Sequence, residues 1–173
     1  IMEWTTERRY RRYEDWSNDE IKQIKEKMAQ SPWHTHYHVE PKTGLLNDPN
    51  GFSYFDGKWI LFYQNFPFGA AHGLKSWVQI ESDDLVHFSE TRVKVLPDTK
   101  LDSHGAYSGS AMQFGDQLFL FYTGNVRDEN WIRHPYQIGA LMDKDGKITK
   151  IDKILIDQPT DSTDHFRDPQ IFN

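Results

Sequence analysis

The sequence contains no cysteine among its 173 residues. A disulfide framework and thiolate chemistry are therefore both excluded. The sequence also lacks any apolar run near the roughly 20 residues that a membrane-spanning helix needs. Residues 1–12 are charged and lack the apolar core of a signal peptide. Together these absences predict a cytoplasmic protein that has no membrane partner.

Positive charge is also scarce, because 20 Lys and Arg side chains face 26 Asp and Glu side chains, for a net charge of −6. With no Lys/Arg block, the sequence argues against nucleic acid as a partner. Aromatic residues are abundant, at 6 Trp, 8 Tyr and 11 Phe. Low overall hydrophobicity with many aromatic residues favours a β-rich protein with aromatic-lined grooves. Small sugars are natural partners for such grooves.

The first part of the chain has a different pattern from the rest. Ser17 followed by Glu20 is a capping-box pattern, and Ile21, Ile24 and Met28 then fall on one helical face. This predicts a short helix over residues 18–29. We therefore expect an N-terminal helical extension, residues 1–37, ahead of a β domain over residues 38–173.

The β domain shows a repeat of about 60 residues. Leu61–Tyr63 recurs 59 residues later as Leu120–Tyr122, and Asp48-Pro49 recurs 120 residues later as Asp168-Pro169. Turn signals separate short strands within each unit and predict hairpins at Asp56-Gly57, Gly115-Asp116 and Asp145-Gly146. A unit of this length with four short strands fits one blade of a β-propeller.

Propellers close with four to eight blades. The sequence therefore predicts an all-β fold comprising about two blades, with the first strand of a third, of an incomplete propeller. Unpaired blade edges would favour self-association.

Polar residues recur at one level of this repeat. In a propeller the equivalent strand of each blade lines the central channel, so Asp48 and Asp168 should face one funnel. The middle unit offers Tyr107 and Ser108 at the same level. Polar groups around a cavity are typical of a sugar site. Taken alone, Asn47–Gly51 is equally typical of a plain turn.

These motifs together resemble glycoside hydrolase family 32, the β-fructosidases. The family pattern W-M-N-D-P-N-G stands here as Leu45–Gly51, F-R-D-P is intact as Phe166–Pro169, and the serine-glycine-serine segment is Ser108–Ser110. Within the family, Phe66–Gly73 and Asn130–Gln137 look most like the bacterial branch that acts on sucrose 6-phosphate. The resemblance implies a five-bladed β-propeller.

The resemblance also implies an activity, which is hydrolysis of the β-fructofuranosyl bond of sucrose 6-phosphate or sucrose by a retaining double displacement. Asp48 would be the nucleophile and Asp168 the transition-state stabiliser, held ionised by the neighbouring Arg167. No cofactor and no metal are implied. The residues that match substrate-binding positions of the family are Asn47, Gln64, Trp77, Tyr107, Ser108 and Arg167.

A substrate that carries a phosphate needs cations near it, and loop residues Lys75, Arg127 and Arg133 are the candidates. The family's general acid/base is a glutamate in an E-C motif well downstream of F-R-D-P, and no such motif occurs in this sequence. We therefore expect that glutamate to lie beyond this chain and the chain alone to be inactive. Two alternatives stay open, an inverting arabinan- or xylan-active propeller hydrolase and a non-catalytic structural fragment.

Overall fold

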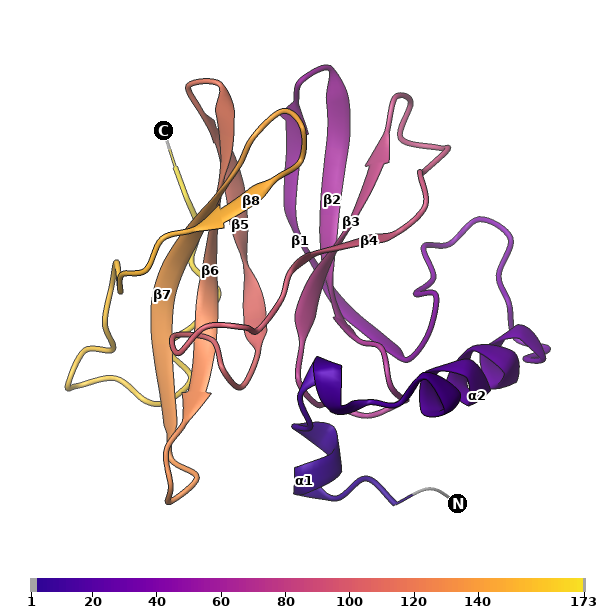
Figure 1. Ribbon diagram of the computed structural model, residues 1–173. Coiled ribbons are helices and arrows are strands. Elements are labelled where there is room, and N and C mark those ends of the chain that lie inside the picture. The colour runs from indigo at the N-terminus through magenta and orange to yellow at the C-terminus, as the bar shows by residue number, and fades with distance from the viewer. Residues whose placement is uncertain (1–2, 173) are drawn as a thin grey trace.

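Two four-stranded antiparallel sheets stand side by side in the computed structural model, which describes residues 3–172 (Figure 1). The first sheet has the order β1-β2-β3-β4 and the second β5-β6-β7-β8. Each is a simple meander, so strands that follow one another in sequence pair with one another. The predicted repeat of about two blades is therefore confirmed as two consecutive sheets of the same topology.

In the first sheet, β1 spans Leu45–Phe55, β2 Lys58–Phe66, β3 Ser76–Ser82 and β4 Arg92–Val95. The β1–β2 hairpin closes at Asp56-Gly57, where both residues have positive φ. Two positive φ values in succession suit the right-handed twist of the paired strands, and Asp and Gly tolerate them. The predicted turn at this position is confirmed.

In the second sheet, β5 spans Ala106–Phe114, β6 Gln117–Arg127, β7 Arg133–Met142 and β8 Ile148–Lys150. The innermost strands of the two sheets, β1 and β5, lie next to each other. This adjacency matters for function, because the residues that repeat 60 positions apart are thereby brought to one place.

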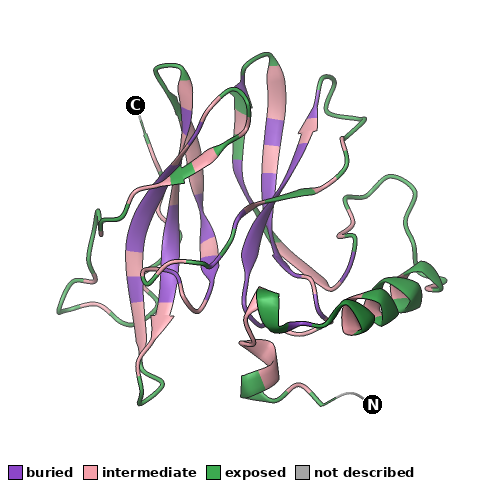
Figure 2. Cartoon of the chain, in the orientation of Figure 1, coloured by how far each residue is buried: buried purple, intermediate pink, exposed green. Residues whose placement is uncertain are grey.

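The core lies between the two sheets, where the buried segments of both face each other (Figure 2). Trp77 of β3 is its largest member and contacts Phe62 and Tyr122, with ring centroids 5.2 Å and 5.7 Å away. The contact between Trp77 and Tyr122 joins the two blades. Each blade thus buries the apolar face that its neighbour would otherwise leave exposed.

The predicted helix is confirmed as α2, Asn18–Ala29, and the Ser17–Glu20 capping box is formed in both directions. Two shorter elements were not predicted, α1 at Thr6–Arg9 and a 3-10 turn, η1, at Tyr13–Asp15. Both are too short to show helical periodicity in sequence. The segment is instead held by aromatic packing against the β2–β3 loop, with Trp16 stacked on Phe68 at 4.2 Å.

Residues 166–172 do not form the predicted first strand of a third blade. They run beside β5, where the Ser110 hydroxyl donates to the Pro169 carbonyl and accepts from the Ile171 amide. A strand is defined by a ladder of backbone hydrogen bonds to a partner strand. Here the contacts pass through a side chain instead, which places Asp168 next to β5 without a ladder.

Within residues 3–172, no helix combines the length and the apolar character required to cross a membrane.

Candidate active site

The β1–β2 pairing and the β5–β6 pairing each contain a register shift at the equivalent position of the two blades. Candidate site residues lie at both shifts. In β1 the pairing with β2 shifts between Asn47 and Pro49, which leaves Asp48 out of the ladder. In β5 the shift falls between Ala106 and Gly109, which frees Tyr107 and Ser108. Such bulges redirect side chains and are frequent beside active sites. The register shift therefore recurs in both blades, just as the strands do.

Backbone strain marks both candidate carboxylates. Asp48 has a φ of 40° and Asp168 a φ of 60°, in the left-handed region that non-glycine residues rarely adopt. Asp tolerates this region better than most residues, and such strain concentrates at functional sites. The Asp168 amide donates to the Thr123 hydroxyl at 3.1 Å. This bond from β6 holds the strained residue in place.

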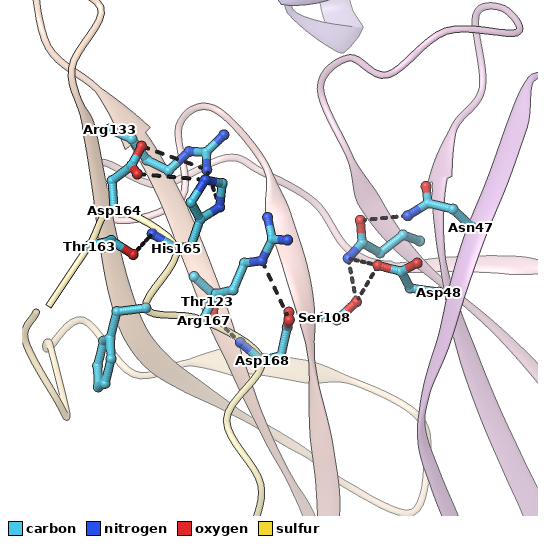
Figure 3. Close-up of polar contacts among 12 residues, drawn as sticks. Asn47, Asp48, Ser108, Thr123, Arg133, Thr163, Asp164, His165, Arg167 and Asp168 are labelled. Atoms are coloured by element: carbon cyan, nitrogen blue, oxygen red, sulfur yellow. Dashed lines mark hydrogen bonds and ion pairs between the residues drawn. The ribbon is translucent and has the colours of Figure 1, made fainter.

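A hydrogen-bond network surrounds Asp48 (Figure 3). Its Oδ2 accepts from the Ser108 hydroxyl at 3.2 Å and from the Gln64 amide at 3.5 Å. Gln64 also donates to Ser108 at 2.5 Å and accepts from the Asn47 amide at 3.3 Å. The four predicted residues thus form one connected group across β1, β2 and β5.

Two cavities meet at this group, and Asp48 and Asp168 line both. The larger, of about 550 Å³, runs between β1 and β5 and includes Ser108 in its wall. The smaller, of about 290 Å³, opens toward the N-terminal segment. Eight of the predicted residues line the smaller cavity, namely Asn47, Asp48, Gln64, Lys75, Tyr107, Arg133, Arg167 and Asp168.

The electrostatics of Asp168 differ from the expectation that Arg167 dominates. Burial raises the pKa of the Asp168 carboxyl above its usual range, Arg167 at 3.5 Å opposes this, and the nearby Asp48 adds to it. The ion pair is weak because water reaches both partners, with the Arg167 side chain 41% exposed and the Asp168 side chain 49% exposed. Asp168 therefore binds a proton more readily than an isolated aspartate.

Lys75, which the sequence predicted as a phosphate-binding loop residue, lies directly before β3 and is buried. The residue is only 2% exposed, and its ammonium group contacts the Asn47 side-chain oxygen. Burial lowers the pKa of Lys75 to about 8, and Asp48 offsets part of this effect. Lys75 thus lines the smaller cavity as a buried charge beside the carboxylate network, and its predicted role in phosphate binding stays a prediction.

The lowered pKa of Lys75 predicts a pH-dependent stability. Between about 8 and the ordinary value of 10.5, the unfolded chain binds more protons at this position than the folded one, so stability rises with pH. Lys75→Met removes this contribution. Unfolding by denaturant at about pH 8 and about pH 10 should show the wild type gaining stability relative to the variant at the higher pH.

The matched control is Lys22→Met, since Lys22 has an exposed side chain on α2. The difference in free energy of unfolding between Lys22→Met and the wild type should stay constant across the same pH range. If the difference in free energy of unfolding between Lys75→Met and the wild type also stayed constant with pH, Lys75 would not be a buried charge with a lowered pKa.

Trp77 and Arg127 are not brought to the cavities. Trp77 is 0% exposed, and its indole N–H donates to the Tyr107 carbonyl at 2.9 Å. A fully buried ring cannot contact a sugar, so the prediction of a direct contact is corrected to packing beneath Tyr107.

Arg127 donates to the Trp131 carbonyl at 2.9 Å and lies over the Trp131 ring. Its guanidinium is thus occupied by the β6–β7 loop.

Tyr10 of the N-terminal segment lies in the wall of the smaller cavity and was not predicted as a site residue. No sequence signal pointed to it, because its approach depends on how the segment docks on the β2–β3 loop. His72 and Gly73 of the β2–β3 loop also line this cavity and were not predicted as site residues. Across residues 3–172, no group of three or more His, Asp or Glu side chains could hold a metal ion.

Paired carboxylates in a polar cavity, set between consecutive propeller blades, are the arrangement expected of the propeller class of glycosidases. A family model described as "Glycosyl hydrolases family 32 N-terminal domain" matches residues 38–173. The chain belongs to this family, as its motifs indicated.

The relatives agree with this assignment. A sucrose-6-phosphate hydrolase of Streptococcus mutans is 73% identical over 165 residues, which is 95% of this chain and 34% of that protein. The structure of sucrose-6-phosphate hydrolase from Lactobacillus gasseri matches with a TM-score of 0.95 at 51% identity, over 99% of this chain and 35% of that one.

A more distant structure, a mutant GH32 beta-fructofuranosidase of Bombyx mori in complex with sucrose, matches with a TM-score of 0.72 at 30% identity. The match covers 91% of this chain and 35% of that one. The chain thus spans about a third of the length of the relatives it matches.

Proposed function

We propose that the protein containing this chain hydrolyses the β-fructofuranosyl bond of sucrose 6-phosphate, with sucrose as a poorer substrate. The observation that carries the proposal is the Asp48 network, in which Ser108 and Gln64 orient one carboxylate oxygen while Asp168 lines the same cavity. The likeness to two sucrose-6-phosphate hydrolases supports the choice of substrate.

In this proposal Asp48 is the nucleophile. Both hydrogen bonds that reach its carboxylate from the described residues fall on Oδ2, so we assign Oδ1 to the attack. Oδ1 forms an ester with the fructosyl anomeric carbon as the bond to the glucosyl oxygen breaks. Water then cleaves the ester and returns the carboxylate, so that two displacements retain the configuration.

Asp168 and Arg167 bind fructosyl hydroxyls and stabilise the oxocarbenium-like transition state. A retaining mechanism also needs a proton donor for the leaving oxygen. Of the residues that the structure describes, Asp48 and Asp168 are the carboxylates that line the two cavities. We therefore assign proton transfer to a third carboxylate, a glutamate supplied by the remainder of the protein.

Arg133 is the cation we assign to phosphate recognition. It lines the smaller cavity, and its ion pair to Asp164 is long, at 3.9 Å. A planar guanidinium can bind phosphate through two parallel hydrogen bonds. The proposed substrate is a charged ester that does not cross a bilayer unaided, so the enzyme must act on the side where the ester forms, which we propose to be the cytoplasm.

The stereochemistry of the first product tests the proposal. Proton NMR of the full-length protein acting on sucrose 6-phosphate should show β-fructofuranose forming first and equilibrating later. Initial release of the α anomer would contradict a retaining nucleophile and favour the inverting alternative, since inversion places water where the covalent bond would form. Sucrose under the same conditions is the control substrate, and it should give the same anomer more slowly.

A further inference from the structure

The N-terminal segment reaches the active-site cavity through one side chain. Tyr10, directly after α1, lines the smaller cavity together with Arg133 and the candidate carboxylates. The family model begins at residue 38, so Tyr10 lies outside the matched domain. A residue of the extension therefore contributes to a site whose other members come from the blades.

The segment is anchored on both sides of Tyr10. The Arg9 carbonyl accepts from the Leu74 amide at 2.8 Å, and the Tyr13 hydroxyl donates to the Leu74 carbonyl at 2.9 Å. Arg12 donates to the Ser103 carbonyl at 3.1 Å. These bonds join the segment to the β2–β3 loop and to the loop before β5, so Tyr10 is held by both blades.

Aromatic side chains fix the ring of Tyr10. Trp131 meets it edge to face, with centroids 5.1 Å apart, and His104 lies 5.9 Å away. Burial, with Arg127 and Arg12, lowers the pKa of His104, which favours the neutral ring. The two rings thus orient the Tyr10 ring from the side of the β6–β7 loop and the loop before β5.

Tyr10 and Arg133 both border Tyr107. Burial, together with the neighbouring Tyr10 hydroxyl, raises the pKa of Tyr107 to about 12, and the Arg133 guanidinium lies over the Tyr107 ring at 6.0 Å. The three side chains thus form one wall of the cavity, contributed by the N-terminal segment, β5 and β7. This wall combines aromatic faces and hydroxyls with a cation.

We propose that Tyr10 is a substrate-binding residue that contacts the hexose leaving group. The inference rests on the proposed function. The fructosyl carbon must lie at Asp48 and Asp168 to react, and both cavities meet there. The smaller cavity contains Arg133, the cation assigned to the phosphate, so we place the hexose in that cavity, toward Tyr10. Aromatic faces pack on sugar C–H surfaces, and the phenol hydroxyl can hydrogen-bond a sugar hydroxyl.

The test uses Tyr10→Ala in the full-length protein. We expect KM for sucrose 6-phosphate to rise about tenfold while kcat changes less than about twofold, because a contact made equally in ground and transition states affects KM alone. KM for sucrose should rise by a similar factor, since both substrates share the hexose. The matched control is Glu7→Ala, an exposed position of α1, which should leave both constants unchanged.

Thermal unfolding shows whether each variant is folded, and Tyr10→Leu replaces Tyr10→Ala if the latter is not. A folded variant with wild-type KM for both substrates would overturn the role of Tyr10, as would a fall in kcat alone, which is what lost packing produces. Absence of hydrolysis by the wild type would instead refute the proposed function. The two failures are therefore distinguishable.

Discussion

Asp48→Asn should lower kcat/KM for sucrose 6-phosphate by at least about 10³-fold in the full-length protein, because an amide cannot form the covalent intermediate. Asparagine is the sharpest replacement at this position. It tolerates the φ of 40° and keeps an oxygen that can accept from Ser108 and Gln64. The loss should therefore report on the nucleophile and not on the fold.

Release of glucose 6-phosphate under initial-rate conditions measures the effect. The matched control is Asp116→Asn in the exposed β5–β6 turn, which should retain wild-type turnover. An Asp48→Asn variant that hydrolyses sucrose 6-phosphate at the wild-type rate would refute the nucleophile assignment. A loss shared with Asp116→Asn would point to a general defect of the preparation.

Trp77→Ala should reduce the free energy of unfolding by about 3–5 kcal/mol, the usual cost of deleting a large buried aromatic side chain. Trp77 is 0% exposed and packs between Phe62 of its own blade and Tyr122 of the next. Alanine leaves a cavity between the blades and removes the hydrogen bond to the Tyr107 carbonyl. Denaturant unfolding measures the change.

The matched control is Trp33→Ala, because Trp33 is 85% exposed. That change should stay within about 0.5 kcal/mol of the wild type. If Trp77→Ala kept wild-type stability and instead raised KM for sucrose, the original prediction of a sugar contact would be restored. The comparison thus separates packing from binding at this one position.

Local patterns carried much of the fold. The Ser17–Glu20 box predicted the start of α2, and Asp56-Gly57 predicted the first hairpin. These succeed because capping and tight turns depend on a few neighbouring residues. The 60-residue repeat predicted two similar sheets for a related reason, since each blade pairs strands that are consecutive in sequence.

Residue type alone did not predict the burial or the contacts of three side chains. Lys75 and Arg127 carry charges that suit a phosphate, and Trp77 matches a substrate-binding position of the family. Lys75 and Trp77 are buried, and Arg127 is held by Trp131. The solvent exposure of a side chain depends on what the neighbouring blade covers, and no local sequence pattern indicates this. The sequence likewise carried no sign of Tyr10, because its place depends on the docking of a segment across two loops.

The sequence by itself determined the repeat, the carboxylates Asp48 and Asp168, and membership of the family. Those features are local motifs and spacings. Only the tertiary structure decided which side chains share a cavity, because that depends on β1 meeting β5, on bulges in both strands, and on the N-terminal segment closing one side. Burial then altered the charges, lowering the pKa of Lys75 and raising that of Asp168, and burial is a property of the assembled blades.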